Sequence, residues 1–405
     1  MSDQGQPITE PVNHRLSKKK MKLLILITTV FCLFGVLVFC WWLFWGRFVK
    51  STNDAYVQGN QVTLTPQVSG IVTSVNVDET QMVMEKQVLV CLDETDYRIT
   101  LEAAQSRLGQ VIRDVTEMFE NVYALAAQFE LRQAELFKAE VDYNDRRQVV
   151  SEGAVSDEEL IHAEANYYAA KANVKSIKYQ LMQAISAVQN TTISTHPLVE
   201  TAKEDLRQAW VNLQRCTLRA PVTGIIAQKA VQVGESVNQL SPLLAIIPLD
   251  QLWINANFKE TQLSKIRIGQ PVTMTADMYG REVIYTGQVI GISSGSGAVF
   301  SPLPPQNATG NWIKIVQRIP VRIAINSDQL RRYPLWLGLS MNVKVDVRDT
   351  QGVRVPPPAV EKGLYVTDIF KTQIDGAEEI IEQILQKNIT FDLSISHDVL
   401  SLVGK

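Results

Sequence analysis

The sequence has few of the residues that build reactive centres. Its 405 residues include four cysteines and four histidines. The histidines are scattered, without the H-E-x-x-H or C-x-x-C spacing of a metal site. Four cysteines are too few for a disulfide framework, and buried free thiols are the commoner state for a pair such as Cys91 and Cys216. No G-x-x-x-x-G-K-[ST] motif is present, so nucleotide hydrolysis is not predicted.

Neither sign of charge is in large excess, because the formal net charge is only -3. This balance lacks the basic footprint of a nucleic-acid-binding protein. Gly291 to Gly295 has the letters of a G-x-S-x-G nucleophile motif, but that motif needs a helix directly after the serine. Gly297 and Pro302 follow Ser293 instead. The sequence therefore predicts a protein that is not an enzyme and that binds no cofactor and no metal.

An apolar run without charge extends from Leu23 to Trp45, which is long enough to span a bilayer. It ends in an interfacial belt of Trp41, Trp42 and Trp45. Basic residues are Arg15, Lys18, Lys19, Lys20 and Lys22 before the run, and Arg47 and Lys50 after it. This asymmetry predicts a cytoplasmic N-terminus and a single membrane anchor. A cleaved signal peptide is the alternative, but Trp-Gly-Arg-Phe follows the run instead of a small-x-small site.

A heptad repeat fills the middle of the chain. Its a positions are Leu101, Leu108, Val115, Val122, Phe129, Leu136 and Tyr143, and most d positions are Ala104, Val111, Met118, Leu125 and Ala139. This spacing predicts a long helix with a narrow coiled-coil face. The pattern stops after Val149, and Ser156 with Glu159 forms a capping-box signature for a second helix.

The second helix continues the repeat. Its a positions are Leu160, Tyr167, Val174, Leu181 and Val188, and after a polar break from Asn190 to Pro197 they are Val199, Leu206 and Leu213. Because the turn is short, two arms of about 50 residues should lie antiparallel and reach roughly 75–80 Å at ~1.5 Å per residue. We predict a hairpin at residues 94–215 with its tip at about 149–157.

Two short β-rich segments on either side of this hairpin resemble each other. Val68–Val72 matches Val222–Ile226, and the same separation pairs Val83 with Val237 and Leu89 with Leu243. Each half is too small to bury a face alone, so the two should pack into one β-sandwich that looks like a split lipoyl domain. The hairpin interrupts the loop that would carry a modified lysine, so Lys86 and Lys229 are interpreted as solvated surface residues.

Alternating apolar residues from Leu252 to Asp349, separated by turn signals, predict a β-barrel of about six strands. Ser293 to Gly310 is rich in Gly, Ser and Pro and should be a loop inside it. Pro356–Pro358 marks the end of the barrel, and Ala377 to Lys387 has the pattern of a short amphipathic helix. No function is predicted for residues 360–405.

The order of anchor, half-lipoyl, hairpin, half-lipoyl and barrel resembles the periplasmic adaptor (membrane fusion) proteins of Gram-negative bacteria, the HlyD-like family. The stretches that resemble its EmrA-type members are Asp54–Val57, Gln67–Gly70, Asn257–Gln262, Ile268–Val272 and Pro305–Trp312. These members serve multidrug exporters of the major facilitator superfamily (MFS). The resemblance covers roughly residues 15–350, and its barrel motifs are more specific than its hairpin.

The resemblance implies a tripartite pump made of a proton-driven inner-membrane exporter, this adaptor and a TolC-like outer-membrane channel. It also implies self-association into a ring or another homo-oligomer. Family adaptors meet the channel through the hairpin tip, which here implies contacts by Arg146, Val149, Gly153, Val155 and Ser156. The usual arginine position is Asp145, with Arg146 beside it. Capping of the second helix would by itself also explain Ser156.

A second group of residues is not demanded by the strand pattern: Phe258, Lys259, Glu260, Phe300 and Trp312. A surface loop needs neither Phe nor Trp. One interpretation is a loop that folds onto its own barrel. The other is a contact with the exporter, a neighbouring adaptor or the drug.

The sequence thus predicts an α+β, multidomain protein of the Gram-negative inner membrane, with most of the chain in the periplasm. The expected parts are a cytoplasmic tail at 1–22, a transmembrane helix at 23–45, lipoyl halves at 51–93 and 216–249, the hairpin at 94–215, a β-barrel at 250–350 and a C-terminal tail at 351–405. Three alternatives stay open: an adaptor of an ABC-type (type I) polypeptide secretion system, a lipoylated or biotinylated carrier, and a membrane-anchored coiled coil with a structural role.

Overall fold

The computed structural model describes residues 18–44, 46–297, 299, 316–358 and 364–404. The predicted sites at Trp45, Phe300 and Trp312 lie outside these residues, as does most of the predicted cytoplasmic tail. The chain divides into two compact units. One comprises residues 1–61 and 247–363, and the other comprises residues 62–246 and 364–405.

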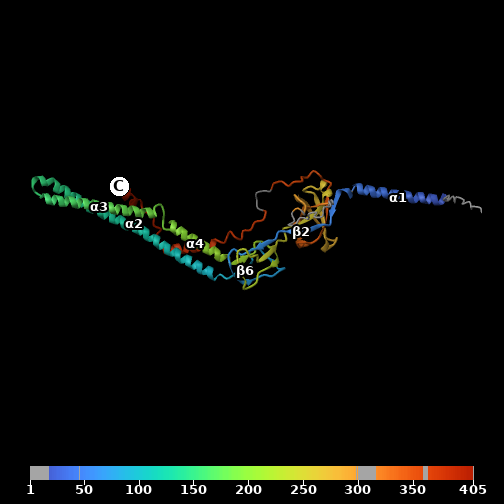
Figure 1. The fold of residues 1–405 in the computed structure, drawn as a ribbon, viewed down its shortest axis with the longest axis horizontal. Helices are drawn as coiled ribbons and strands as arrows, with labels where there is room; N and C mark the ends of the chain where they lie inside the picture. Colours follow the sequence, from blue (N-terminus) through green and yellow to red (C-terminus); the bar gives the residue numbers. More distant parts are fainter. Residues whose placement is uncertain (1–17, 45, 298, 300–315, 359–363, 405) are drawn as a thin grey trace, which may run out of the picture. The chain divides into compact units, whose positions relative to one another are not determined.

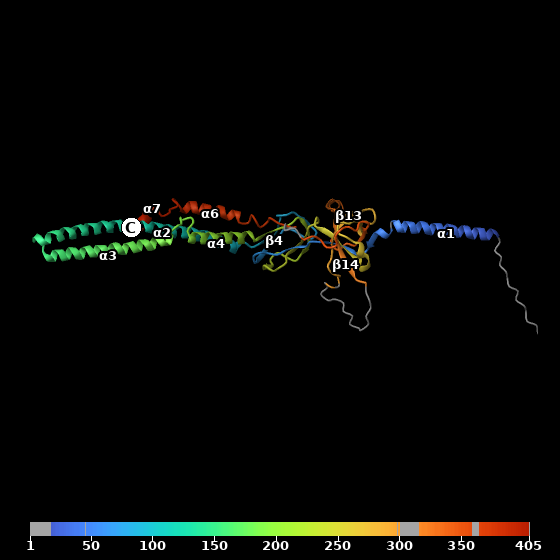
Figure 2. The same cartoon turned by 90° about the horizontal axis from the view of Figure 1, so that it is seen from above.

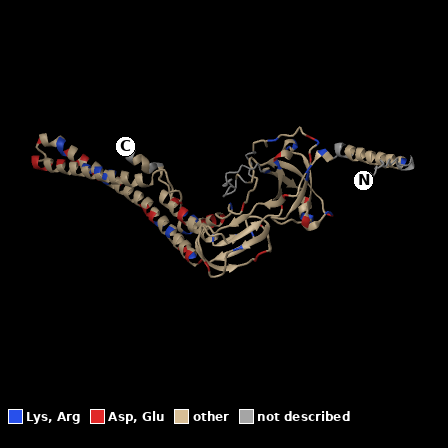
Figure 3. Cartoon of the chain, turned by 45° about the vertical axis from the view of Figure 1, so that its right-hand side comes forward, with Lys and Arg blue, Asp and Glu red and all other residues tan. Residues whose placement is uncertain are grey.

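The first helix, α1 (Lys18–Phe44), begins before the predicted anchor. Its stretch from Met21 to Cys40 has a mean hydropathy of 2.9 and none of it is buried against the rest of the protein. From Leu23 onward this helix shows no charged residue (Figure 3). By length and composition, α1 could therefore cross a membrane.

Seven antiparallel strands form the sheet of the first unit, in the order β1-β15-β12-β13-β14-β11-β2. Their bounds are β1 Val49–Thr52, β2 Ala55–Gly59, β11 Leu252–Lys259, β12 Pro271–Ala276, β13 Tyr285–Ile292, β14 Arg318–Ile325 and β15 Met341–Asp346. The short helical segment η1 (Gly46–Phe48) precedes β1, and three others lie between strands: η3 Glu260–Lys265, η4 Asp277–Tyr279 and α5 Ser327–Arg332. The Asn326 side chain caps the start of α5 by accepting from the Asp328 amide.

This sheet curls toward closure, because β2 contacts the segment just before β15. The Val57 amide donates to the Leu339 carbonyl at 3.0 Å, and Tyr56 forms an isolated bridge with Ser340. The prediction that residues 51–93 form one lipoyl half was therefore wrong at its start. Ala55 and Val57 alternate with exposed Tyr56 so that one face of β2 enters the barrel core, and β1 and β2 complete a barrel of more strands than expected.

The second unit contains two four-stranded sheets, in the orders β3-β10-β8-β5 and β7-β6-β4-β9. Their strands are β3 Val62–Leu64, β4 Gly70–Val75, β5 Met82–Val83, β6 Val88–Leu92, β7 Thr217–Arg219, β8 Gly224–Lys229, β9 Ser236–Val237 and β10 Leu244–Ile247. Each sheet takes two strands from each side of the hairpin, so both halves contribute to both sheets. Lys229 is not freely solvated, because its Nζ lies 2.8 Å from Asp78 Oδ1 and its side chain is only 20% exposed.

The hairpin consists of α2 (Thr95–Val149), the turn η2 (Val150–Glu152), α3 (Asp157–Val188) and α4 (Pro197–Gln214). The α2 and α3 helices run side by side (Figure 1). Seam residues of the heptad are fully buried at Leu108, Val115, Val122, Leu181 and Leu206. Toward the tip the seam is thinner, because the buried residues of α2 end at Phe129.

Residues 364–404 are not a free tail, which corrects the prediction. They contain α6 (Asp375–Asn388) and α7 (His397–Gly404), and α6 lies along α2 and α4 (Figure 2). The amphipathic helix predicted at Ala377–Lys387 is confirmed within α6. Its apolar residues Ala377 and Ile381 are buried in the same core as the hairpin seam.

Candidate functional site at the hairpin tip

A tight turn reverses the chain between α2 and α3. After the single 3-10 turn η2, Gly153 adopts φ 75° in the left-handed region, and its amide donates to the Val150 carbonyl at 3.0 Å. A side chain at this backbone conformation would be strained, which explains the glycine. The sequence thus confines the reversal to Val150–Val155 and presents a short, exposed peptide loop at the end of the hairpin.

Ser156 starts α3 through a complete capping box. Its Oγ accepts from the Glu159 amide at 3.2 Å, while the Ser156 amide donates to Glu159 Oε2 at 3.0 Å. The hydrogen bonds from the Ser156 amide and hydroxyl hold the pKa of Glu159 below its ordinary value. The predicted capping role of Ser156 is therefore confirmed, and it uses both polar groups of the residue.

The remaining predicted tip residues gather around this turn. Arg146 Nε lies 3.0 Å from Asp142 Oδ1 one helical turn back, so its guanidinium already has a partner on its own helix. Val149 and Val155 are half-buried. Just below them, the rings of Tyr143 and Tyr167 stack with centroids 5.7 Å apart and join the two arms. The structure thus brings all the predicted tip residues together at a turn that the tyrosine stack and the capping box stabilise.

The second predicted group is divided by the structure. Phe258 lies in β11 opposite Ile319 of β14, and its side chain is fully buried in the barrel core. It cannot contact a partner in the folded barrel, so that prediction was wrong: the alternation in β11 turns Phe258 inward. Lys259 and Glu260 follow it and are exposed. The Lys259 and Glu260 amides are held by Gln262 and by the Gln317 carbonyl.

Three of the predicted anchor residues, Leu23, Trp41 and Trp42, lie in α1. Leu23 is 58% exposed, as a lipid-facing side chain would be without its bilayer. Trp41 and Trp42 belong to the last turn of the helix.

Sequence reasoning missed a set of residues that bind α6 and the following loop to the hairpin. On the hairpin they include Arg207 and Trp210, and on the C-terminal segment they include Gly376, Ile381 and Asp392. A signal for this site was present in α2, since Ile112, Phe119 and Ala126 widen its apolar face beyond the a and d positions. A two-helix seam does not need them.

Comparison with known proteins identifies the family. Residues 95–216 match the domain described as "EMRA, alpha-helical hairpin domain". The chain is 37% identical over 383 residues to the multidrug export protein EmrA of Haemophilus influenzae, covering 94% of this chain and 97% of the relative. The chain belongs to the EmrA family.

A second member of the family matches the chain at a similar identity. The multidrug export protein EmrA of Escherichia coli is 38% identical over 354 residues, covering 87% of this chain and 91% of the relative. A solved structure of the periplasmic adaptor protein EmrA aligns with 74% of this chain and 99% of its own length, at 19% identity and a TM-score of 0.37. The EmrA-family assignment rests on the sequence relatives.

Proposed function

We propose that this EmrA-family chain is the periplasmic adaptor of a tripartite multidrug efflux pump. In this proposal it links a proton-driven MFS exporter in the inner membrane to a TolC-like channel in the outer membrane. The export function is supported by relatives that are named multidrug export proteins and that this chain matches over nearly their whole length. The adaptor role is supported by the hairpin itself.

The observation that carries the adaptor role is how the hairpin is rooted. The α2 helix starts directly after β6 and α4 ends directly before β7, and these two strands pair, with Cys91 opposite Thr217. Both arms therefore leave adjacent strands of one sheet. Such a base fixes where the long arms start, which suits a part that must reach a partner at a distance from the β-sandwich.

Membrane placement follows from α1. We propose that α1 is a single span in the Gram-negative inner membrane, with the N-terminus in the cytoplasm and the bulk of the chain in the periplasm. The excess of Arg and Lys before the helix supports this orientation.

The tip is the proposed contact with the channel. A photoreactive phenylalanine analogue at Ala154, in the exposed loop, should form an adduct with an outer-membrane channel protein in native cells. The same analogue at Lys175, exposed on α3 away from the tip, is the matched control and should not. A channel adduct from Lys175 and none from Ala154 would contradict the proposed contact.

The exporter contact is proposed for Lys259 and Glu260 together with Phe300 and Trp312. Replacing Phe300 and Trp312 by Ala should lower drug resistance at unchanged protein level. Unchanged resistance in that double variant would count against the contact.

Self-association is supported by two exposed apolar stripes on the outward sides of the distal hairpin. The stripe on α2 consists of Ala124, Ala127, Leu131, Ala134, Phe137 and Val141. The stripe on α3 consists of Ile161, Ala165, Tyr168, Ala172, Tyr179 and Met182. Phe137 is 69% exposed and Tyr168 is 57% exposed. Because the arms face each other through their seam, these stripes point to opposite sides.

The two stripes lie at the same height along the hairpin. Leu131 and Tyr179 are equally far along their helices from the stacked pair Tyr143 and Tyr167. A neighbour related by rotation alone could therefore place its α3 stripe on this α2 stripe, which is the geometry of a closed ring.

Cysteine cross-linking tests this arrangement. With the native cysteines replaced, Phe137→Cys combined with Ala172→Cys, which lie at nearly the same height along the hairpin, should give covalent oligomers, whereas either substitution alone should not. Efficient cross-linking of Phe137→Cys alone would instead indicate a two-fold contact, and no cross-linking would refute both.

A further inference from the structure

The C-terminal segment, residues 364–404, adds a third helix to the lower part of the hairpin, which is the part next to the β-sandwich. Its helix α6 lies along both α2 and α4 (Figure 2). Ala377, Ile381 and Val399 are 0%, 3% and 7% exposed in the common core. The segment is therefore part of the hairpin core, although the barrel strands separate it from the hairpin in sequence.

The place where this segment sits is encoded in α2. Ile112, Phe119 and Ala126 repeat every seven residues beside the a/d seam and are 0%, 0% and 6% exposed. The next three positions of that repeat are Gln133, Glu140 and Arg147, all exposed. This apolar seat begins beside the end of α6, where Arg113 Nη1 donates to Asn388 Oδ1 at 3.0 Å. It ends at Ala126, just past Tyr123, where the loop after α6 contacts α2. Its extent therefore fits a dedicated site for the C-terminal segment.

Charge and shape fix the start of α6. Glu378 accepts two hydrogen bonds from Arg207, to Oε1 from Nε at 2.6 Å and to Oε2 from Nη2 at 3.1 Å. The Trp210 indole donates to the Gln373 carbonyl at 2.9 Å. Gly376 lies against that indole so closely that an added Cβ would be 2.3 Å from Cζ2. Bidentate arginine pairs of this kind have strict geometry, so they set the register of α6 on α4.

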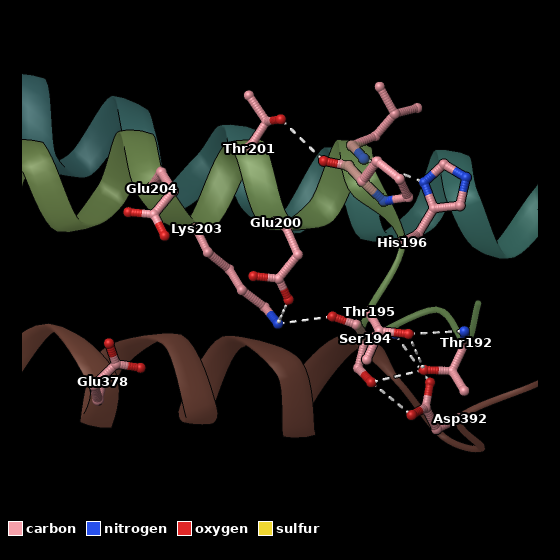
Figure 4. A network of polar contacts seen from close by, with 12 residues as sticks. Thr192, Ser194, Thr195, His196, Glu200, Thr201, Lys203, Glu204, Glu378 and Asp392 are labelled. Atoms are coloured by element: carbon pink, nitrogen blue, oxygen red, sulfur yellow. Dashed lines mark hydrogen bonds and ion pairs between the residues drawn. The ribbon is translucent and has the colours of Figure 1, made fainter. Parts of the chain in front are cut away.

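The loop after α6 reaches the joint between α3 and α4, residues 189–196 (Figure 4). Asp392 accepts from the Ser194 amide at 3.0 Å and from the Ser194 hydroxyl at 2.7 Å. Thr192 forms an isolated bridge with Ser394, and the Tyr123 hydroxyl of α2 donates to the Ser394 carbonyl at 2.8 Å. The C-terminal loop therefore lies between the joint and α2 and bonds to both.

The other polar ties of the joint run to α3 and α4, and its Ile193 side chain is buried in the hairpin core. Lys203, whose side chain is 10% exposed, donates from Nζ to the Ser194 carbonyl at 2.7 Å and to Glu200 Oε1 at 2.8 Å (Figure 4). His196 caps α4 by accepting from the Leu198 amide at 3.3 Å. Both interactions link the joint to α4, and His196 Nε2 also lies 3.2 Å from the Ala187 carbonyl of α3. In the described structure, the polar link between the joint and α2 passes through Ser394.

We propose that residues 364–404 are a clamp that latches a hinge in the second arm of the hairpin. With the clamp docked, α4 and the joint are held on α2 and the lower hairpin is stiff. With the clamp released, α4 is held by a narrow seam that includes Ala202 and Ala209, and the joint at 189–196 becomes a point of flexion. The clamp thereby controls how motion at the β-sandwich reaches the tip.

Hydrogen exchange on the full-length protein in detergent tests the latch. Ile381→Asp places a charge in the buried seat, and truncation after Pro358 removes the clamp altogether. Both should speed amide exchange at residues 190–203 by at least about tenfold. Exchange at 163–177, farther along α3, should not change. Gln383→Ala, exposed on the same helix, is the matched control and should behave like the parent.

A charge-reversal pair separates a specific latch from general damage. Arg207→Glu and Glu378→Arg should each raise exchange at the joint, and the double variant should restore protection. Joint exchange that stays at the parent rate in the truncated chain would overturn the proposal. So would a rise that includes the β-sandwich strands, because it would report general destabilisation rather than release of a hinge.

Discussion

Replacing Phe258 by Ala distinguishes a core residue from a partner contact. Phe258 is 0% exposed and packs in the barrel core with residues of β11, β12, β13, β14 and β15. Removing a buried phenyl ring costs about 3–5 kcal/mol, which combines lost transfer energy with the cavity left behind. A domain is typically stable by about 5–15 kcal/mol. We therefore expect the barrel to lose a large share of its stability.

The assay is urea-dependent hydrogen exchange of β11 and β14 in the full-length protein, with Lys259→Ala as the neighbouring exposed control. The control should shift the free energy of unfolding by no more than about 0.5 kcal/mol. Drug resistance in the Phe258→Ala strain should fall only as far as the level of folded protein falls. Lost resistance with unchanged barrel stability would refute the core assignment and restore a contact role.

Three further outcomes follow from the structure. Ser156→Ala should cost about 0.5–2 kcal/mol and speed exchange in the first turn of α3, whereas Ser156→Asp should preserve the cap; equal exchange in both variants would contradict capping. Burial and the nearby acidic charges raise the pKa of Cys216 to about 11, so its thiol should alkylate at least about tenfold more slowly than Cys91 at neutral pH. A spin-label distance between α6 and α2 should lengthen in acid. The Arg207 hydrogen bond lowers the pKa of Glu378, and although burial alone would raise the pKa of Asp392, hydrogen bonds from Ser194 lower it overall. Both carboxylates therefore support docking of the C-terminal segment on the hairpin at neutral pH, and this support is lost as pH falls below about 4. An unchanged distance at pH 3 would contradict this.

Much of the fold follows from local sequence patterns. The heptad from Leu101 to Tyr143, the capping box at Ser156 and the apolar run from Leu23 each specify a helix boundary or face through neighbouring residues alone. The repeat of Val68–Val72 in Val222–Ile226 similarly indicates a two-part β-sandwich, and the structure interleaves its strands in both sheets.

The errors concern contacts between residues far apart in sequence. Nothing local to Ala55 and Val57 indicates that β2 pairs with β11 and completes the barrel instead of the sandwich. Phe258 is interpreted as a loop residue only if the strand that starts at Leu252 is assumed to end before it, whereas β11 continues to Lys259. The apolar residues Ile112 and Phe119 required a third helix, but the sequence does not state which distant segment supplies it.

The measurement that most directly tests the adaptor assignment is affinity purification of the tagged chain from its native membranes after mild cross-linking, with the partners identified by mass. The account predicts a polytopic exporter without an ATPase domain together with an outer-membrane channel. Recovery of an ABC ATPase in place of that exporter, or of no membrane partner at all, would contradict it.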